Sequence, residues 1–463
     1  IPHVVGKRAR RVRFDAGGAQ MGQPPERVDE LSRFADLLDD APAASGSGRA
    51  GRIALLVVLI TMLVAALGTG GYVWWASAAP LPAPTLATQP PPVTAGAAAA
   101  VRLPSTGAMR VSVVGGEQYL GADDDGAWAA AGGDDPRPIA SVAKLITALV
   151  VLDRHPLDGP NDPGPTVAFT EADTDLYDEF YVRGATIAKM PDRTTLSLHD
   201  ALATMLLPSA SNYAVALARW GYGSEGAYVD AANAWLEANG LTSTRIVDAT
   251  GLDDRNTSTP RDLVALGKIA ESHAALAAIV ALPSISLPDG PGFVTNTNDL
   301  LGTAGVRGLK TGNLGEGTFN LLFSSLLDVG VEAPLQITGV RLGGETHDST
   351  DQDVAAFLKS VQDGFHDVPV ASPGEDLGTI TTAWGAEARV VLTGTVAIRT
   401  WSDTPVTPSV AIVTPQTWAD GETVGTVTWT AGPHTASSDL KIVGNLEPPT
   451  LWWRLTHPGQ LGG

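Results

Sequence analysis

An uncharged apolar run, IALLVVLITMLVAALGTGGYVWWA at residues 53–76, constrains this chain more than any other feature. It is long enough to cross a bilayer, because a transmembrane helix needs about 20 apolar residues. Arg49 and Arg52 stand just before it, and no Lys or Arg follows until Arg102. That asymmetry predicts a single-pass protein of the cell membrane, with its N-terminus in the cytoplasm and the following domains outside.

The rival interpretation of this run is a cleaved signal peptide, because ASA at residues 76–78 has the small-residue pattern of a cleavage site. The long segment before the run and the length of the run itself favour an uncleaved anchor. Tyr72, Trp74 and Trp75 fit the aromatic belt at the outer membrane interface.

The two segments that flank the run differ in composition. Residues 1–52 are polar and predict a largely disordered cytoplasmic tail, with a short helix at Val28–Leu38. The chain begins with Ile1, and Met21 offers an alternative start. Residues 77–100 are rich in Pro and Ala and predict a semi-rigid extended spacer of about 60 Å, at about 3.1 Å per residue.

Residues 101–368 alternate helical and strand signals and predict a mixed α/β (α+β) domain. The clearest helix start is STPRDLVALGKIAE, where Ser258 or Thr259 is the N-cap and Pro260 stands in the first turn. After the first predicted helix comes a long acidic segment at residues 158–184, which predicts a solvated loop, with an entrance to a substrate site as the alternative.

Residues 369–463 contain short β-rich runs broken by Gly and Pro and predict a small all-β domain. In TVTWT, Val427 and Trp429 alternate with threonines, as in a half-buried strand. The final stretch, LWWRLTHPGQLGG, is too short and too broken by Gly and Pro for a long amphipathic helix.

Charge and composition exclude several kinds of site. The formal net charge is −20, and so acidic a chain is repelled by phosphate backbones, which argues against nucleic-acid binding. There is no cysteine, which excludes disulfides and Cys-ligated zinc. His347 lies near Asp348, Asp351 and Asp353, but a polar loop leading into a helix is favoured over a metal site. No metal and no cofactor is expected.

The segment PIASVAKLITALVVLD places Ser141 and Lys144 one helical turn apart, at the head of an apolar helix. A serine hydroxyl needs a base close by to act as a nucleophile, and a lysine serves if burial or a second cation lowers its pKa. The alternative is structural: Ser141 as an N-cap and Lys144 as a surface residue. This pair alone does not decide between the two.

Two segments farther along the chain favour the catalytic interpretation of Ser141 and Lys144. LLPSASNYAVALA contains Ser209, and RGLKTGNLGEGT contains Lys310, Thr311 and Gly312 ahead of a predicted strand. A cation beside a hydroxyl suits a substrate carboxylate, and a glycine lets a backbone approach closely. Lys310 also offers the second cation that would keep Lys144 neutral.

The three motifs SxxK, S-x-N-like and KTG, in this order, are the signature of penicillin-binding proteins and serine β-lactamases. The chain resembles the low-molecular-mass penicillin-binding proteins of the DacA type, serine D-alanyl-D-alanine carboxypeptidases of peptidase family S11. The resemblance covers about residues 135–345 and includes VDATGLDDRNTSTPRDL and NTNDLLG. It implies the transpeptidase fold of that family, an antiparallel sheet flanked by helices, followed by a β domain.

The resemblance also implies roles for individual residues. Ser141 is the expected acylated nucleophile, Lys144 its base, and Ser209 the relay of a proton to the leaving amine. Lys310 and Thr311 are expected to hold the terminal carboxylate of the peptide. The expected oxyanion hole is formed by the backbone N–H groups of Ser141 and Asn313. The implied substrates are peptidoglycan stem peptides ending in D-Ala-D-Ala, with β-lactams as covalent inhibitors.

The middle motif departs from the family pattern Ser-x-Asn. Aligned on the residues around it, the motif is Ser209-Ala210-Ser211, and Asn212 stands one position late. Either Ser211 substitutes for the asparagine, or a local shift brings Asn212 into the substrate site. A hydroxyl cannot bridge two partners as an amide does.

Two other functions remain as alternatives. A serine β-lactamase of class A needs a carboxylate in an ExxLN-type loop, and none lies between Ala143 and Lys310. A catalytically weak wall-binding module is supported only by Ser211, whereas Ser141, Lys144 and the KTG motif are intact.

Overall fold

The computed structural model describes residues 48–92, 94–121 and 125–462. The tail predicted for residues 1–52, with its short helix at Val28–Leu38, therefore lies outside the described residues as far as residue 47. The chain divides into two compact units: a smaller one, of residues up to Leu81 with Pro449–Gly463, and a larger one, Pro82–Pro448.

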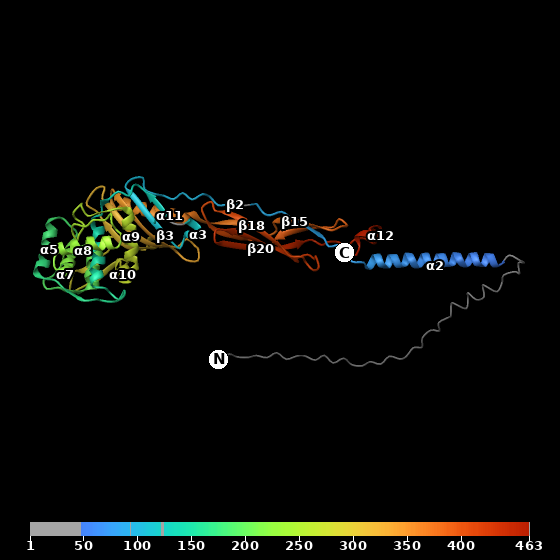
Figure 1. Ribbon diagram of the computed structural model, residues 1–463, viewed down its shortest axis with the longest axis horizontal. Coiled ribbons are helices and arrows are strands. Elements are labelled where there is room, and N and C mark those ends of the chain that lie inside the picture. The colour runs from blue at the N-terminus through green and yellow to red at the C-terminus, as the bar shows by residue number, and fades with distance from the viewer. Residues whose placement is uncertain (1–47, 93, 122–124, 463) are drawn as a thin grey trace, which may run out of the picture. The chain divides into compact units, whose positions relative to one another are not determined.

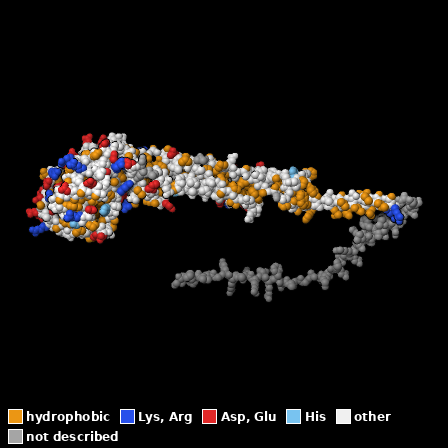
Figure 2. Space-filling model, viewed as in Figure 1, with side chains coloured by type: hydrophobic (Ala, Val, Ile, Leu, Met, Phe, Trp, Pro, Cys, Tyr) orange, Lys and Arg blue, Asp and Glu red, His pale blue; other side chains and the backbone are white. Residues whose placement is uncertain are grey.

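The smaller unit contains the apolar helix α2 (Gly48–Ala78) and the short helix α12 (Leu451–Thr456). Among the described residues, α2 is the one unbroken helix long and apolar enough to cross a membrane, with a mean hydropathy of 2.5. Figure 2 shows its surface almost entirely hydrophobic. The hydroxyl of Tyr72 donates to the carbonyl of Leu455 at 2.7 Å, and Arg454 donates to the carbonyls of Ala76 and Ala79 at 3.1 and 3.0 Å. These bonds attach α12 to the end of α2.

A five-stranded antiparallel sheet lies at the centre of the larger unit's first part, in the order β11-β12-β13-β3-β4. Because β11 forms an edge of this sheet, one of its sides is free to contact other elements. The strands are β3 (Ala108–Val114), β4 (Ala129–Ala131), β11 (Val306–Gly312), β12 (Phe319–Leu327) and β13 (Leu335–Gly344).

Helices cover both faces of this sheet (Figure 1). Leu322 belongs to the apolar core shared with α9, whereas its neighbours Leu321 and Phe323 belong to the core under α11, as strand alternation requires. Helix α9 begins as predicted: the N-cap Thr259 accepts a hydrogen bond from the amide of Asp262, and Pro260 follows it. The mixed fold of helices and antiparallel sheet is therefore confirmed. The helices are α4 (Ala143–Arg154), α6 (Leu198–Leu206), α7 (Ser211–Tyr222), α8 (Glu225–Ala238), α9 (Pro260–Ser272), α10 (Ala274–Val280) and α11 (His347–Gly364).

The acidic segment at residues 158–184 is not a solvated loop, so that prediction is wrong. It contains β6 (Thr166–Ala168) and α5 (Glu171–Val182). A capping box of Thr170 and Asp173 starts α5, and Leu176 and Phe180 are buried one turn apart. Most of the acidic residues of α5 lie on its outer face, whereas Leu176 and Phe180 face the core.

Several short elements complete the first part. They are α3 (Glu117–Leu120), β5 (Arg137–Pro138) paired with β8 (Thr257–Ser258), β7 (Thr195–Ser197) paired with β6, β9 (Ser284–Leu287) paired with β10 (Gly292–Thr295), and the single-turn helices η1 (Ala140–Val142) and η2 (Thr303–Gly305); η3 (Pro458–Gln460) lies in the smaller unit.

The second part of the larger unit is all-β, as predicted. Val427 is fully buried and Trp429 is 2% exposed, whereas the threonines that alternate with them are more exposed, which confirms the predicted alternation. The strands are β14 (Phe365–Ala371), β15 (Asp376–Thr381), β16 (Glu387–Leu392), β17 (Val396–Trp401), β18 (Pro405–Ile412), β19 (Thr423–Ala431) and β20 (His434–Val443).

Within the segment expected as a spacer, residues 77–100, two short strands pair with this β part. Its strand β1 (Thr85–Thr88) pairs with β15, and β2 (Thr94–Ala95) pairs with β18, so the sheet order is β1-β15-β16-β20-β19-β18-β2. The contact with β1 is close, because a Cβ at Gly378 would lie 2.2 Å from the carbonyl oxygen of Ala87. The Pro-rich backbone is extended, as expected, but it covers both edges of the sheet rather than standing free.

Candidate active site

Ser141 lies in the middle of η1, immediately before α4. The preceding residue, Ala140, has φ = +51°, a backbone conformation that residues other than glycine rarely adopt. Ser209 shares this feature, with φ = +66°. Such residues cost about 1–3 kcal/mol each and concentrate at functional sites. Two predicted catalytic serines therefore coincide with strained turns.

Lys144 lies on the first turn of α4 and has no exposed surface. Its Nζ is 2.9 Å from Oγ of Ser141 and 2.8 Å from the carbonyl oxygen of Thr250. Burial lowers the pKa of Lys144 to about 7, and the charge of Asp248 only partly opposes this. The apolar helix thus supplies the desolvation expected from the sequence, and an amine that is partly neutral near pH 7 lies within hydrogen-bond distance of the Ser141 hydroxyl.

A loop at residues 248–256 contacts this pair through the carbonyl of Thr250, and none of its residues was predicted to act in the site. The carboxylate of Asp248 accepts hydrogen bonds from the amides of Thr250 and Gly251, both at 2.6 Å, and from the side chain of Asn256 at 2.9 Å. Burial raises the pKa of Asp248, but these and its other hydrogen bonds outweigh burial and leave that pKa below its usual value. At Gly251 a Cβ would lie 1.9 Å from the carbonyl of Ala140, so the loop contacts the nucleophile turn directly.

The KTG motif ends strand β11, against the same turn. A Cβ at Gly312 would lie 2.9 Å from the amide nitrogen of Ser141, which explains the glycine. Lys310 is 2% exposed, and its Nζ lies 3.1 Å from the carbonyl of Thr311. Burial lowers the pKa of Lys310 well below its usual value, and the positive charge of Lys144 lowers it further. The hydroxyl of Thr311 lies 2.6 Å from that of Thr297, a further residue without a role in the sequence analysis.

The residues of the middle motif, Ser209 to Asn212, differ in their hydrogen bonding. Ser209 is 6% exposed, and its Oγ is buried without a hydrogen-bond partner among the described residues. The side chain of Asn212 is bound to the backbone of Ala188: its amide oxygen accepts from the N–H of Ala188 at 3.1 Å, and its amide nitrogen donates to the carbonyl of the same residue at 2.8 Å. The backbone N–H of Ser211 donates a hydrogen bond to the carbonyl of Thr186, two residues before Ala188, with 2.8 Å between nitrogen and oxygen.

Asn313 follows the KTG motif, and its side-chain nitrogen Nδ2 lies 2.9 Å from Nε2 of His347. Burial lowers the pKa of His347. Burial, with the charges of Asp299 and Asp348, raises the pKa of Asp351 to about 6. His347 begins helix α11, and among the residues that the structure describes no group of His, Asp and Glu is arranged to hold a metal ion.

This arrangement suits acyl transfer. A buried neutral amine next to a serine hydroxyl is the pairing that activates such a nucleophile. The structure brings Ser141, Lys144 and the end of β11 together, through the contact between Gly312 and Ser141 and the electrostatic effect of Lys144 on Lys310.

Comparison with known proteins agrees with this geometry. The family model for D-alanyl-D-alanine carboxypeptidases, peptidase S11, matches residues 128–329. A D-alanyl-D-alanine endopeptidase from Haemophilus influenzae is 32% identical over 196 residues, which cover 41% of this chain and 63% of the relative. The D-alanyl-D-alanine carboxypeptidase DacD from Escherichia coli is 25% identical over 259 residues, which cover 55% of this chain and 64% of the relative.

These alignments span 63% and 64% of the two relatives, less than two thirds of either. Among solved structures, penicillin-binding protein 5 from Haemophilus influenzae superposes with a TM-score of 0.47 and 19% identity, over 78% of this chain and all of the other. Through the domain at residues 128–329, which carries the SxxK and KTG motifs in contact, this chain is similar to the S11 family of D-alanyl-D-alanine carboxypeptidases.

Proposed function

We propose that this protein is a serine-type D-Ala-D-Ala carboxypeptidase that removes the terminal D-Ala from peptidoglycan stem peptides. One observation carries the proposal: a fully buried lysine, with a pKa of about 7, lies 2.9 Å from the hydroxyl of Ser141. A base of this pKa is half neutral near physiological pH, as a general base should be.

In this mechanism neutral Lys144 takes the proton of Ser141, and Oγ attacks the carbonyl of the penultimate D-Ala. The backbone N–H groups of Ser141 and Asn313 stabilise the oxyanion. Ser209 passes the proton from Lys144 to the leaving amine, and the peptide bond breaks as D-Ala departs. Water then hydrolyses the ester on Ser141, which returns the free enzyme and the shortened peptide.

The substrate carboxylate is assigned to Lys310 and Thr311, with Gly312 leaving room for it. Both Lys144 and Lys310 are buried, neither forms an ion pair with a carboxylate among the residues that the structure describes, and burial lowers the pKa of each. A bound carboxylate supplies the missing negative charge and favours protonated Lys310. Substrate binding therefore separates the roles of the two lysines: Lys310 charged, Lys144 neutral.

The proposed organisation places residues 101–368 as the D,D-peptidase domain outside the membrane, with α2 as its anchor and residues 369–463 as a β domain. The length and hydropathy of α2 support the anchor. The arginines before it support a cytoplasmic N-terminus.

An endopeptidase that cuts cross-links is the second candidate, because three curated relatives at 32–36% identity carry that name. The test incubates the full chain in detergent with fluorescent penicillin, a diacyl-D-Ala-D-Ala peptide and a cross-linked peptide dimer. We expect labelling and D-Ala release, both absent in Ser141→Ala. Cleavage of the dimer alone would favour the endopeptidase, rapid turnover of penicillin alone a β-lactamase, and no labelling a non-catalytic wall-binding module.

A further inference from the structure

A second polar pocket lies on the larger unit, between α9, α10 and strands β11 to β13. Its volume is about 130 Å³, and it is lined by Glu271, Ala277, Val280, Arg307, Leu309, Ser324, Ser325, Leu326 and Gln336. None of these residues has a role in the proposed reaction. Leu309 directly precedes Lys310, so the pocket adjoins the strand that carries the KTG motif.

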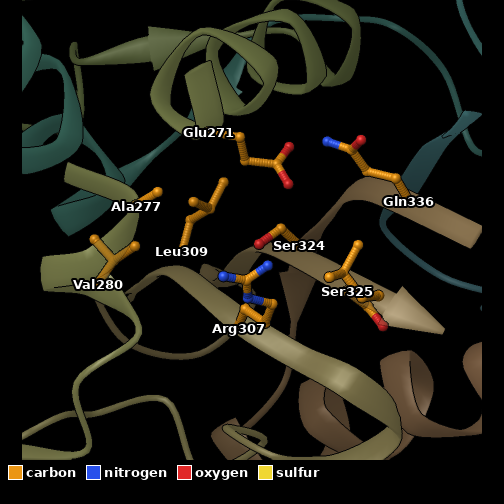
Figure 3. Close-up of a pocket in the computed structure, with 9 residues that line it drawn as sticks. Glu271, Ala277, Val280, Arg307, Leu309, Ser324, Ser325 and Gln336 are labelled. Carbon is orange, nitrogen blue, oxygen red and sulfur yellow. The ribbon is translucent and has the colours of Figure 1, made fainter. Parts of the chain in front are cut away.

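The pocket holds one group of each charge. Figure 3 shows the carboxylate of Glu271 and the amide of Gln336 on one side and the guanidinium of Arg307 on the other, with Leu309 and Ser324 between them. Thr338 donates a hydrogen bond to Glu271 at 2.5 Å, and Ser324 and Gln336 also bond its side chain. The carboxylate is therefore held in place by neutral groups.

Arg307 and Glu271 are not paired with each other. Across the described part of the chain, neither takes part in an ion pair, although the charge of Arg307 reaches Glu271 and lowers the pKa of that carboxyl against the dominant effect of burial, which raises it. A ligand with only a negative charge would be repelled by Glu271, and a ligand with only a positive charge would be repelled by Arg307. A ligand that carries both charges satisfies both side chains.

Size limits the ligand further. A cavity of about 150 Å³ accommodates benzene, so this pocket fits a molecule of about six non-hydrogen atoms. Ala277, Val280 and Leu309 provide apolar wall for a short side chain. An alanine zwitterion meets the requirements of size, charge and side chain together.

We propose that this pocket binds a small zwitterionic α-amino acid, with its carboxylate on Arg307 and its ammonium group on Glu271. D-alanine, which the carboxypeptidase reaction releases, is such a molecule, and the choice of this amino acid rests on the proposed function. The pocket is then a product site, distinct from the one at Ser141.

The test titrates D-alanine by calorimetry into the full chain in detergent, after penicillin has blocked Ser141. We expect one site per chain, with binding weakened about tenfold or more in Arg307→Gln and in Glu271→Gln, because a hydrogen bond to a charged group is worth at least about one decade in the dissociation constant. Propionate and ethylammonium, with one charge each, are expected to bind as weakly. Arg389→Gln, which removes an exposed arginine of the β part, is the matched control and should bind normally.

Absence of binding to the wild-type chain, or equal binding by both pocket variants that still melt cooperatively, would overturn the proposal. Equal affinity for L-alanine and D-alanine would keep the amino-acid site and remove its assignment to the product. If penicillin fails to acylate Ser141 while Arg307→Gln still abolishes D-alanine binding, the proposed reaction is wrong and the pocket stands.

Discussion

In the proposed mechanism, Lys144 sets the pH range in which Ser141 can react. Because burial lowers its pKa to about 7, the fraction of neutral lysine rises with pH through that value. We expect the rate of acylation by fluorescent penicillin to rise through about pH 7 and to level off above it. Lys144→Arg, which stays protonated, should lose about 10²-fold or more. A rate independent of pH from 5 to 9 would contradict a lysine base.

The same shift has a consequence for stability. In the unfolded chain Lys144 has a pKa near 10.5, so between about pH 7 and 10.5 the unfolded state binds more protons than the folded state. The contribution of Lys144 to the free energy of unfolding is therefore least favourable below pH 7 and improves as the pH rises through this interval. Urea unfolding of the wild-type chain and Lys144→Met, compared at pH 6 and pH 9, measures this contribution.

Asn212 and Ser211 are expected to differ in what they support. Asn212→Ala leaves the N–H and carbonyl of Ala188 unpaired in a buried place, which costs about 1–3 kcal/mol and lowers the melting temperature. Ser211→Ala should weaken acylation more than Asn212→Ala does, with little effect on melting. Asn239→Ala, at an exposed asparagine, is the control. Equal or reversed effects on acylation would show that the motif register is shifted by one.

At this scale the sequence indicates Ser141, Lys144 and Lys310 as candidates, because their spacing forms a recognisable set. It does not reveal the partners that hold them. Thr250 reaches Lys144 from a loop 106 residues away, through a backbone carbonyl that any residue type would supply. Such a contact depends on tertiary structure and cannot be predicted from the type of residue at position 250.

Among the elements, the approach of β11 to η1 depends on Gly312. A Cβ there would lie 2.9 Å from both the carbonyl of Ile139 and the amide of Ser141, so Gly312→Ala must move the strand or the turn. We expect acylation to fall by about 10²-fold, since small displacements of catalytic groups cost that much. Gly226→Ala, on helix α8 with nothing near its Cβ position, is the control and should be neutral or slightly stabilising.

Elements with a strong periodic pattern are predictable, and those that depend on a partner are not. Helix α9 and strand β19 have the caps and alternation that define them locally. Helix α5 has a capping box and two apolar residues, but its acidic residues obscure them. Strand β1 has no strand signal, because Pro and Ala dominate around it and its pairing is supplied by the edge of β15.

For the whole molecule, the compact unit is expected to begin at residue 82 rather than at residue 101. Removing residues 82–100 exposes the edges of β15 and β18, and unpaired edge strands promote aggregation. A chain of residues 82–448 should remain monomeric and acylate normally, whereas residues 101–448 should aggregate and melt at a lower temperature. Light scattering and thermal unfolding of the two chains measure this, and equal behaviour would show that the covering strands contribute nothing.

The attachment of α12 to α2 gives the larger unit two connections to the smaller one. The chain leaves the smaller unit at Leu81 and returns to it at Pro449, where Arg454 bonds the last carbonyls of α2. A protease that cuts once after α2 therefore leaves residues 82–448 joined to the tail, and the tail still held by Tyr72 and Arg454. Separation of the larger unit from α2 therefore requires either a second cut or the release of α12.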